Sequence, residues 1–527
     1  MPARLKSEGR LTPRSGHAGG AVGLRLTVDA RAVGDAERRA MLALGAALAV
    51  LLAVRIVALR FSVTDLFFDE AQYWTWSLEP AFGYYSKPPL IAWLIRGATA
   101  VCGGSEVCIR LPSPVLHTVT AVLVLALGKR LYGAAAGVWS AIVFATLPGI
   151  SVSSGIISTD VPLLLFWALA LVAFVEILER HSWWPAILLG VALGLGLNAK
   201  YAMIYFVLCG GLYIAFTPDR RPLLRDARLW VALGLAALLI VPNLYWNLTH
   251  GFATFSHTAD NAKWTGSLLN PFHAFEFIAS QFAVFGPILF AALAVIAVRA
   301  WRTGVAESDR LLLAFALPVI ALVGVQAFLS RAHANWAALA YVSGSVLVTT
   351  TLLRQAQRWL KASLALHVAF VVGLGLATAH AGSFMLPGIG DPFARTLGWR
   401  QMAQVTRHAL EDARRSARPF AGVITDDRAV TAELLYYMRD EPTPVLAWRQ
   451  AARPHDHYEL TRPFQGGAPE AVLLVSIRRK LDGILSRFDV AERMQDAQLP
   501  AGAQHRRVVL YRLEGFKGQP NQPLPQR

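Results

Sequence analysis

Charged residues are scarce in this chain, at 16% of its 527 positions, whereas 55% of its positions are hydrophobic. So apolar a composition excludes a soluble globular protein of this length. Cysteine is also rare, and three residues exclude a disulfide-rich scaffold. The spacing of Cys102 and Cys108 allows either a local disulfide or two free thiols. Cys209 lies within an apolar run and is expected to be a small packing residue.

Acidic side chains are fewer than basic ones, 34 against 50, which gives a formal net charge of +16. Such an excess can indicate a nucleic-acid partner. Here, however, Lys and Arg lie in short segments between apolar runs and in the tails. This distribution favours contacts with anionic membrane lipids and control of membrane topology, and we expect no nucleic-acid partner.

Long apolar runs dominate the first three quarters of the chain. A membrane-spanning helix needs about 20 apolar residues, or fewer where the bilayer is thin. The sequence therefore predicts an α-helical polytopic membrane protein with about eleven spans. The predicted spans are 40–60, 113–128, 135–152, 160–178, 184–198, 201–216, 229–246, 275–299, 311–329, 337–353 and 363–381.

The loops between these runs differ in charge. Lys and Arg gather in one set of loops and in the N-terminal tail 1–39, whereas the opposite loops hold few of them. The positive-inside rule then places the N-terminus in the cytoplasm, and the segment 61–112 and the C-terminal region outside. The tail has no sustained apolar period and is predicted to be disordered. No cleavable signal peptide is expected before the first span.

The first outer segment, 61–112, is too long for a simple loop. We expect helices over 68–78 and 89–102, separated by Pro88 and Pro89, because a proline pair breaks the chain and suits a helix start. The Trp and Tyr residues of these stretches are typical of helices that lie in the membrane interface.

The hydrophobic pattern changes near residue 390. We predict a soluble α/β domain over 390–516, on the outer side, and a disordered polar tail over 517–527. Short runs rich in Val, Ile and Leu predict strands, and stretches of helical period predict helices. The strands are expected at 421–427, 471–476 and 507–514, and the helices at 398–417, 429–439 and 480–494.

Two adjacent carboxylates, Asp69 and Glu70, open the first predicted interfacial helix. Neighbouring helical residues point about 100° apart, so one carboxylate can act in a reaction while the other orients a partner or caps the helix. The alternative is that both acids only stabilise the N-terminus of the helix through its dipole. Ionisable groups beside aromatic residues at a membrane boundary favour function, and both are candidate catalytic residues.

Two lysines are candidates for binding an anion. Lys87 precedes the proline pair, which stiffens its backbone, and an ammonium group suits phosphate oxygens. Lys200 lies at an outer turn between two apolar runs, where a lone cation requires an anionic partner. For both lysines the alternative is an interfacial side chain that keeps its charge in water.

Asp160 follows Ser158 and Thr159 and stands two residues before Pro162, at the outer end of a predicted span. This order of residues is typical of a helix N-cap. Capping and catalysis are compatible, and Asp160 lies on the same side of the membrane as Asp69. We therefore take it as a third candidate catalytic residue.

Two further polar clusters, 247–274 and 330–336, are predicted on the outer side. Their histidines match no tight metal-ligand spacing, so contacts with substrate or plain loop polarity are expected instead of a metal site. The candidates for substrate contact in these clusters are His250, His257, Lys263, Arg331, His333 and Asn335.

These motifs, in their order, resemble the bacterial family 39 type of membrane glycosyltransferase, which includes protein O-mannosyltransferase-like proteins and the lipid A aminoarabinose transferase. The resemblance covers roughly residues 40–385 and is specific, because several motifs recur in the same order and on the same side. The matching motifs are Asp69-Glu70-Ala71-Gln72-Tyr73, Lys87-Pro88-Pro89-Leu90, Arg110-Leu111-Pro112-Ser113, Thr159-Asp160-Val161-Pro162 and Lys200-Tyr201.

The resemblance implies a GT-C fold, a polyprenyl-phosphate sugar donor and transfer on the outer face of a bacterial inner membrane. It also implies that Asp69 is the catalytic base, that Lys87 contacts the donor phosphate and that Asp160 is the second acid. Tyr73 and Tyr84 match tyrosines of the family's site.

Two positions depart from the aminoarabinose transferase. Ser86 stands where that enzyme has a glutamate, and Gln72 stands where it has an arginine. Loss of the glutamate argues against a bound metal, so no cofactor is expected to be required, and a divalent metal is the alternative. Loss of the arginine leaves the transferred sugar open.

The expected reaction is a single inverting displacement at the anomeric carbon, in which Asp69 takes the proton of an acceptor hydroxyl and Lys87 and Lys200 stabilise the leaving phosphate. The acceptor is open between lipid A or another glycolipid, a polysaccharide and a protein. A flippase or transporter is the alternative, but it requires polar groups near the bilayer midplane, where these spans have almost none. A membrane-anchored scaffold that acts through its C-terminal domain is a further alternative.

Overall fold

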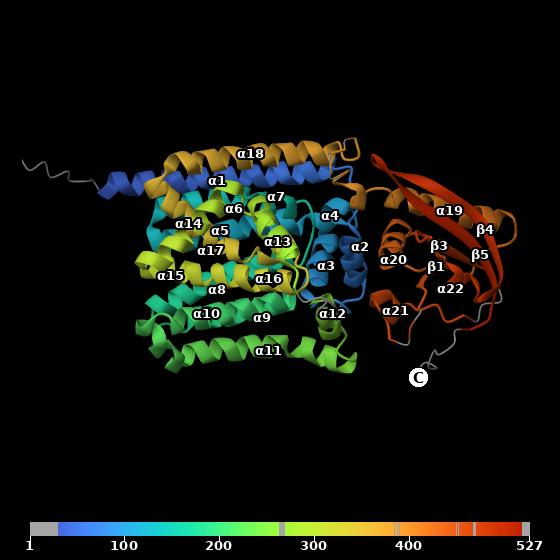
Figure 1. Cartoon of the computed structure of the whole chain (residues 1–527), viewed down its shortest axis with the longest axis horizontal. Coiled ribbons are helices and arrows are strands. Elements are labelled where there is room, and N and C mark those ends of the chain that lie inside the picture. Colours follow the sequence, from blue (N-terminus) through green and yellow to red (C-terminus); the bar gives the residue numbers. More distant parts are fainter. Residues whose placement is uncertain are drawn as a thin grey trace, which may run out of the picture.

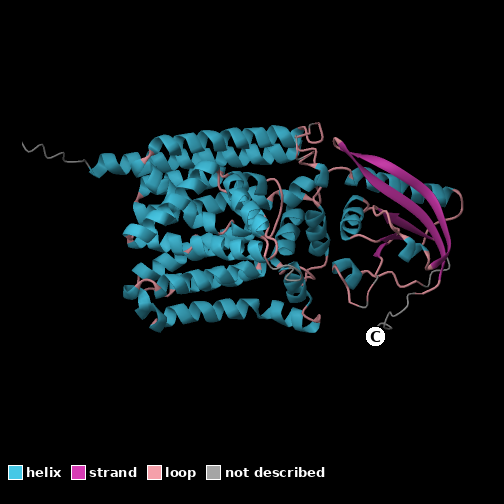
Figure 2. Ribbon diagram, in the orientation of Figure 1, coloured by secondary structure: helices cyan, strands magenta, loops and turns pink. Residues whose placement is uncertain are grey.

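The apolar runs form a bundle of long helices, and the C-terminal part of the chain forms a separate domain at one end of it (Figure 1). The five strands that the structure describes form one sheet in that domain (Figure 2). The computed structural model describes residues 30–262, 269–383, 385–386, 388, 390–449, 451, 453–466 and 471–518.

The helical bundle contains long helices and several shorter ones. They are α1 (Ala30–Phe61), α5 (Pro112–Tyr132), α6 (Ala134–Thr146), α7 (Pro148–Ser153), α8 (Asp160–Glu179), α9 (Trp184–Ala199), α10 (Ile204–Ala215), α11 (Ala227–Thr249), α12 (Ala253–Ala262), α13 (Pro271–Val284), α14 (Pro287–Thr303), α15 (Glu307–Ala314), α16 (Leu317–Leu329), α17 (Ala340–Gln355) and α18 (Gln357–Ala379). Short 3₁₀ turns lie at η1 (Tyr201–Met203), η2 (Pro218–Arg225) and η3 (Ala334–Ala337).

Six helical segments in the described parts of the chain are long and apolar enough to cross a membrane, or seven if the bent pair α13–α14 counts as one span. The protein is therefore a multi-pass membrane protein. The predicted total of eleven is not shown, because α6, α9, α10 and α17 have 12 to 16 residues each. The predicted span 275–299 is bent by 116° at Gly286 and Pro287, since a proline ends the helical hydrogen bonding there.

Part of the predicted N-terminal tail is helical. Residues 30–39 belong to α1, and the Glu37 carboxylate accepts a hydrogen bond from the Lys129 ammonium at 2.5 Å, which supports a helix that extends beyond its apolar part. Residues 1–29 and 519–527, which make up most of the two predicted tails, lie outside the described residues.

Helices predicted within the first outer segment are confirmed as α2 (Phe68–Leu78) and α3 (Leu90–Cys102), and a short α4 (Glu106–Arg110) follows them. A disulfide between Cys102 and Cys108 joins α3 to α4, so the disulfide is the alternative that the structure contains.

A five-stranded sheet with strand order β2-β1-β3-β5-β4 forms the centre of the C-terminal domain. β2, β1 and β3 are parallel, whereas β5 pairs antiparallel with both β3 and β4. The strands are β1 (Gly422–Thr425), β2 (Val445–Ala447), β3 (Val472–Ser476), β4 (Phe488–Ala501) and β5 (Gln504–Phe516), and the helices are η4 (Ala394–Thr396), α19 (Trp399–Arg415), α20 (Arg428–Tyr437), α21 (His457–Thr461) and α22 (Asp482–Leu485).

One element of this domain differs from the sequence prediction. The stretch 480–494 was expected to be a helix, yet only Asp482–Leu485 is helical and β4 begins at Phe488. Ala, Glu, Arg and Met in this stretch favour a helix locally, but the long antiparallel pairing with β5 outweighs that preference.

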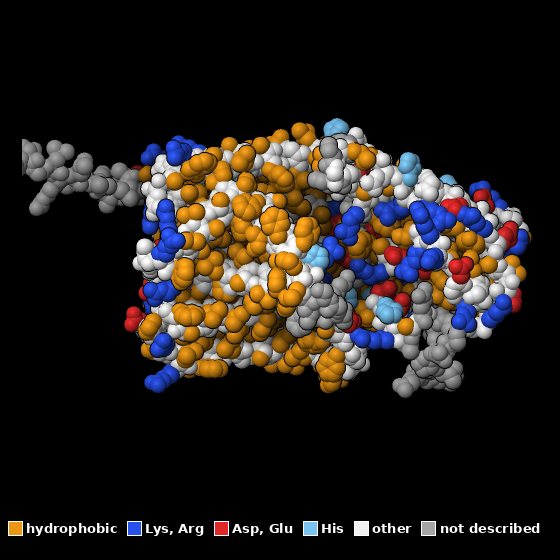
Figure 3. All heavy atoms as spheres, viewed as in Figure 1, with side chains coloured by type: hydrophobic (Ala, Val, Ile, Leu, Met, Phe, Trp, Pro, Cys, Tyr) orange, Lys and Arg blue, Asp and Glu red, His pale blue; other side chains and the backbone are white. Residues whose placement is uncertain are grey.

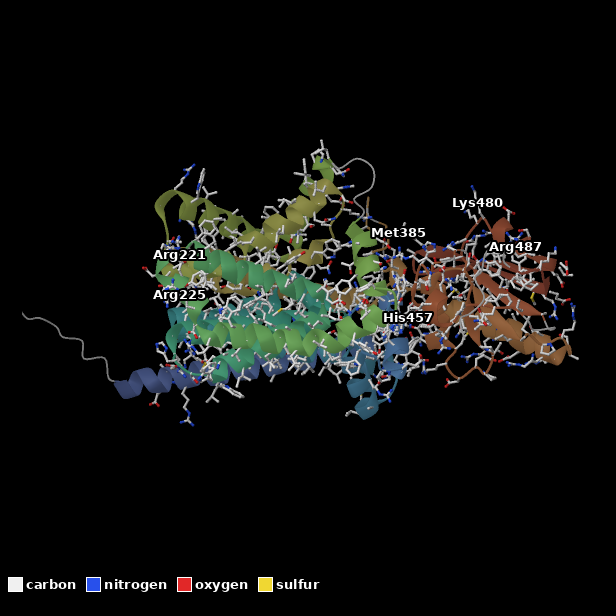
Figure 4. All side chains as sticks on the ribbon, turned by 90° about the horizontal axis from the view of Figure 1, so that it is seen from below. Arg221, Arg225, Met385, His457, Lys480 and Arg487 are labelled. Carbon is white, nitrogen blue, oxygen red and sulfur yellow. A yellow bond between two sulfur atoms is a disulfide. The ribbon has the colours of Figure 1, made fainter. Side chains whose placement is uncertain are left out.

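The C-terminal domain is packed against α2 and α3. An apolar cluster contains side chains of α2, α3 and α20, and the Trp74 ring lies 5.0 Å from the Tyr436 ring. Buried Asp65 accepts a hydrogen bond from the Trp399 backbone at 2.9 Å. His457 lies at this junction, whereas Lys480 and Arg487 lie on the distant part of the domain (Figure 4). The helices α2 and α3 are thus held between the bundle and the domain.

Close packing of α5 on α6 depends on Gly137, where an added Cβ would lie 2.6 Å from the Leu125 carbonyl oxygen and 2.7 Å from the Lys129 nitrogen, both backbone atoms. We expect Gly137→Ala to lower the free energy of unfolding by about 1–3 kcal/mol, because the two helices must separate. Thermal unfolding in detergent measures the change. Gly45→Ala in α1 is the matched control, since a Cβ there meets nothing within 4 Å. Equal melting temperatures for both variants would contradict the expectation.

Candidate active site

Glu70 fixes the start of α2 through a fully buried ion pair. Its carboxylate, 0% exposed, lies 2.7 Å from the Arg110 guanidinium. It also accepts hydrogen bonds from the backbone N–H groups of Phe67 and Ile157, each at 2.9 Å. Arg110 donates in turn to the Asp65 carbonyl at 2.8 Å. Both Glu70 oxygens are thus engaged in holding segments together, and the structure places this candidate catalytic residue away from open space.

Asp69 points away from that pair, as the helical angle between neighbours requires, and its side chain is 36% exposed. Its Oδ1 accepts a hydrogen bond at 2.8 Å from Arg428, and the same guanidinium nitrogen donates to Gln72 at 2.8 Å. Oδ2 accepts no hydrogen bond within the described residues. Asp69 therefore keeps one carboxylate oxygen available to a substrate.

Arg428 was not anticipated from the sequence. It is the first residue of α20, and Asp427 caps this helix by accepting a hydrogen bond from the Ala429 backbone N–H at 2.8 Å. The helix follows the carboxyl end of the parallel strand β1, the edge at which ligands commonly bind in such sheets. The pair of Asp427 and Arg428 at the C-terminal end of the predicted strand 421–427 was therefore the sequence signal that could have indicated this residue.

Asp160 brings two other predicted residues to the site. The Lys200 ammonium lies 2.6 Å from Asp160 Oδ1, and the Asn335 amide donates to Oδ2 at 2.6 Å. These side chains come from the start of α8, the end of α9 and η3. The carboxylate thus orients Lys200 instead of capping α8, for which no side-chain cap bond forms at Thr159.

Lys87 lies in the loop between α2 and α3, which packs on α11. The Asn243 amide donates to the Phe82 carbonyl at 2.7 Å, and a Cβ on Gly83 would lie 2.5 Å from the Trp246 ring, so only glycine fits. The half-buried Lys87 ammonium has no hydrogen-bond or ion-pair partner in the part of the chain that the structure describes. Burial lowers the pKa of Lys87, and the charge of Lys200 lowers it further. The cation therefore lacks a protein anion in contact with it.

Tyr73 and His257 complete the surroundings of Asp69 and Lys87. Burial, and then the charge of Asp69, raise the pKa of Tyr73 well above its usual value, so its hydroxyl stays protonated. Burial, and then the charges of Lys87 and Arg428, lower the pKa of His257 to about 4, so the imidazole is neutral at pH 7. Both residues are neutral polar groups beside charged neighbours.

The remaining candidates lie elsewhere or make other contacts. The Tyr84 hydroxyl donates to the Trp76 carbonyl at 2.9 Å and its ring stacks on Trp76, which places it in the packing of the interfacial helices. His250 stacks on Trp246 at the exposed end of α11. Arg331 and His333 are exposed side chains that precede η3. Lys263 lies outside the described residues.

No group of three or more His, Cys, Asp or Glu side chains among the described residues is arranged to hold a metal ion. The carboxylates at the site face cations instead: Asp69 faces Arg428, and Asp160 faces Lys200. The site thus contains two pairs of an acid with a cation, and Lys87 is a further cation.

Comparison with known proteins identifies relatives of the sequence. Residues 86–246 match the family described as dolichyl-phosphate-mannose-protein mannosyltransferase. The chain is 36% identical over 406 residues to the lipid A galacturonosyltransferase RgtD of Rhizobium johnstonii, an alignment that covers 77% of this chain and 84% of RgtD.

Solved structures of ArnT from Cupriavidus metallidurans share the fold. The apo structure gives a TM-score of 0.59 at 14% identity and covers 88% of this chain and 96% of ArnT. The structure bound to undecaprenyl phosphate gives 0.60 at 13% identity and covers 90% and 98%. An ArnT-like fold therefore extends over the bundle and the C-terminal domain.

Glu70→Ala tests the structural role of the buried pair. Removing one partner of a fully buried ion pair leaves an uncompensated charge, so we expect a loss of about 3–5 kcal/mol in unfolding free energy. Glu79→Ala is the matched control, because Glu79 pairs with Arg462 at an exposed position and should cost about 1 kcal/mol or less. Unfolding in detergent measures both. A Glu70→Ala protein as stable as the control would assign Glu70 to chemistry instead.

Proposed function

The chain belongs to the family 39 type of GT-C membrane glycosyltransferase, and we propose that it transfers a sugar from a polyprenyl-phosphate donor to lipid A by a single inverting displacement. It is therefore a membrane glycosyltransferase. The observation that carries the mechanism is the grouping of Asp69, Lys87 and the Asp160–Lys200 pair at one end of the bundle.

Donor and acceptor are proposed from the relatives. RgtD is described as a lipid A galacturonosyltransferase, and we propose galacturonic acid as the sugar and lipid A as the acceptor. The ArnT structure with bound undecaprenyl phosphate supports a polyprenyl-phosphate carrier. The two lysines also support a phosphate carrier, because a phosphate requires cations where burial weakens its solvation by water.

In the proposed reaction, Asp69 Oδ2 takes the proton of an acceptor hydroxyl as that oxygen attacks the anomeric carbon. The bond between this carbon and the phosphate oxygen breaks, and the electron pair leaves with the polyprenyl phosphate. Lys87 and Lys200 stabilise the charge that develops on the leaving oxygen. Attack opposite the leaving group inverts the anomeric carbon, and no covalent intermediate on the protein is required.

We propose that no metal ion is required. Lys87, which contacts no carboxylate among the described residues, supplies the positive charge that a divalent ion would otherwise place beside the phosphate. Turnover that persists in excess EDTA supports this proposal, and turnover restored only by an added divalent ion argues against it.

The proposed orientation places the site outside the cytoplasm. Arg221 and Arg225 lie at the end of the bundle opposite the C-terminal domain (Figure 4), where other Lys and Arg side chains gather (Figure 3). The positive-inside rule makes that end cytoplasmic. The Cys102–Cys108 disulfide, near the site, is in keeping with an oxidising compartment. A total of eleven spans remains a prediction, which requires short α6, α9, α10 and α17 to cross a locally thinned bilayer.

Asp69→Asn tests the catalytic base. The amide cannot take a proton, so transfer is expected to fall by about 10²–10⁴-fold while the protein stays folded. The assay follows labelled galacturonic acid from its polyprenyl-phosphate donor to lipid A. Asp482→Asn, at an exposed position of α22, is the matched control and should retain normal transfer. Near-normal turnover by Asp69→Asn would exclude this carboxylate as the base.

Lys87→Arg tests the charge beside the phosphate through pH. Because the pKa of Lys87 lies below its ordinary value, deprotonation should reduce transfer at a lower pH than for a free lysine. Arginine stays protonated over the whole range, so the variant should be slower at neutral pH but lack the alkaline fall. Profiles of kcat against pH compare the two proteins. An identical alkaline fall in Lys87→Arg would assign that titration to another group.

A further inference from the structure

A hollow of about 530 Å³ lies on the C-terminal-domain side of Asp69. The start of α2, η4, the start of α20 and the turn between β4 and β5 surround it. Phe68, Arg395, Arg428, His505 and Arg506 are among its lining residues, whereas Lys87 and Lys200 are not. Lys and Arg side chains gather at this junction of bundle and domain (Figure 3). The hollow is therefore distinct from the proposed phosphate site.

Two of these arginines flank the residue beside Asp69. The Arg428 guanidinium lies 4.8 Å from the centre of the Phe68 ring, and the Arg395 guanidinium lies 5.5 Å from the same centre and 4.8 Å from that of Phe67. Aromatic faces attract cations and fix their planes without neutralising them. Both cations thus lie against the Phe68 ring, the residue that precedes Asp69.

Arg506 contributes a third cation. Its guanidinium lies 3.6 Å from the centre of the Trp399 ring and donates to the Ala394 and Leu397 carbonyls at 3.0 and 3.1 Å. Its Nε is buried and has no hydrogen-bond partner among the residues that the structure describes. Burial also lowers the pKa of this guanidinium. The nearby acids, Glu433 first among them, favour this charge without contacting it, so the unpartnered N–H is left for a bound anion to satisfy.

Acids lie near this hollow, but two of its three lining arginines are in contact with none of them. In the described chain, neither Arg395 nor Arg506 has a carboxylate oxygen within 4 Å. Asp427, which also lines the hollow, caps α20 and lies 3.8 Å from Arg478. Among the residues that line the hollow, three arginines stand against one acid, so the lining suits an anionic ligand.

We propose that Arg395, Arg428 and Arg506 form an oxyanion subsite that binds the carboxylate of an acidic sugar beside Asp69. A guanidinium group presents paired N–H donors that match a carboxylate in two parallel hydrogen bonds. Arg428 already contacts the proposed base, and the carboxylate of a uronic acid lies on the same ring as its anomeric carbon. Binding it here places that carbon within reach of Asp69.

This inference rests on the proposed function, and the carboxylate has two sources. It can belong to the transferred galacturonic acid or to an acidic sugar already present on the acceptor glycolipid. In the first case the subsite selects the donor, and in the second case it orients the acceptor. The size of the hollow suits a single sugar with its charged group.

A binding experiment tests the subsite without requiring turnover. Galacturonic acid should raise the melting temperature of the intact detergent-solubilised protein, and galactose, which lacks the carboxylate, should not. Arg395→Gln is the main variant, because its exposed side chain donates no hydrogen bond to the described residues and its loss should leave the fold intact. It should weaken galacturonic acid binding by about tenfold or more. Arg415→Gln, on a 77% exposed side chain of α19, is the matched control.

Kinetic measurements identify the source of the carboxylate. If the donor supplies it, Arg395→Gln and Arg506→Gln should raise KM for polyprenyl-phosphate galacturonic acid and leave KM for the galactose donor unchanged. If the acceptor supplies it, the variants should raise KM for an acceptor that carries acidic sugars and leave that for a neutral glycolipid unchanged. Arg395→Lys should recover part of the loss in either case.

Two results would overturn the inference. One is a melting temperature that responds equally to galacturonic acid and galactose; the other is a loss in the arginine variants that is the same for acidic and neutral substrates. A wild-type protein that binds galacturonic acid through these arginines but transfers no sugar to lipid A would reject the proposed function and keep the subsite.

Discussion

The buried ion pair between Glu70 and Arg110 is the constraint on which the site depends. A carboxylate with no solvent exposure must be fully paired, and here its partners come from the start of α2, from Arg110 and from the backbone of Ile157. These contacts prevent α2 from rotating. Because neighbouring helical residues point about 100° apart, a fixed inward Glu70 turns Asp69 toward open space. The carboxylate of the proposed base is thus positioned by its buried neighbour.

The two lysines of the site are held in place in different ways. Lys200 is held by Asp160, yet an ammonium group has three donors, and one ion pair leaves the others for a phosphate. Lys87 has no such partner among the described side chains, and its loop is fixed by packing on α11. One lysine is therefore oriented by charge and the other by backbone geometry. Together they form the phosphate site of the proposed reaction.

The sequence predicted those features that depend on the local hydrophobic pattern and on the side of the membrane at which a loop lies. Order along the chain and alternation across the membrane placed Asp69, Lys87, Asp160 and Lys200 on one side, and the structure brings them together. Prediction from local sequence pattern was wrong for β4, because its pairing with β5 outweighs a composition that favours a helix. It failed again at Gly286, where an apolar window does not reveal a sharp bend. The role of Glu70 depends on Arg110, which lies 40 residues away in the sequence. The position of Glu70 next to Asp69 suggested a catalytic role instead.

Arg428 was the hardest feature to predict, because it reaches α2 from the C-terminal domain. Gln72, which stands where the aminoarabinose transferase has an arginine, accepts a hydrogen bond from Arg428, so the cation beside Asp69 here comes from another part of the chain. The domain holds that position through the apolar contacts of α20 with α2 and through the buried Asp65. The charge at the proposed base therefore depends on domain docking. This dependence makes the C-terminal domain a part of the proposed active site. Under the proposed subsite, the arginines of this domain select the sugar that reaches Asp69.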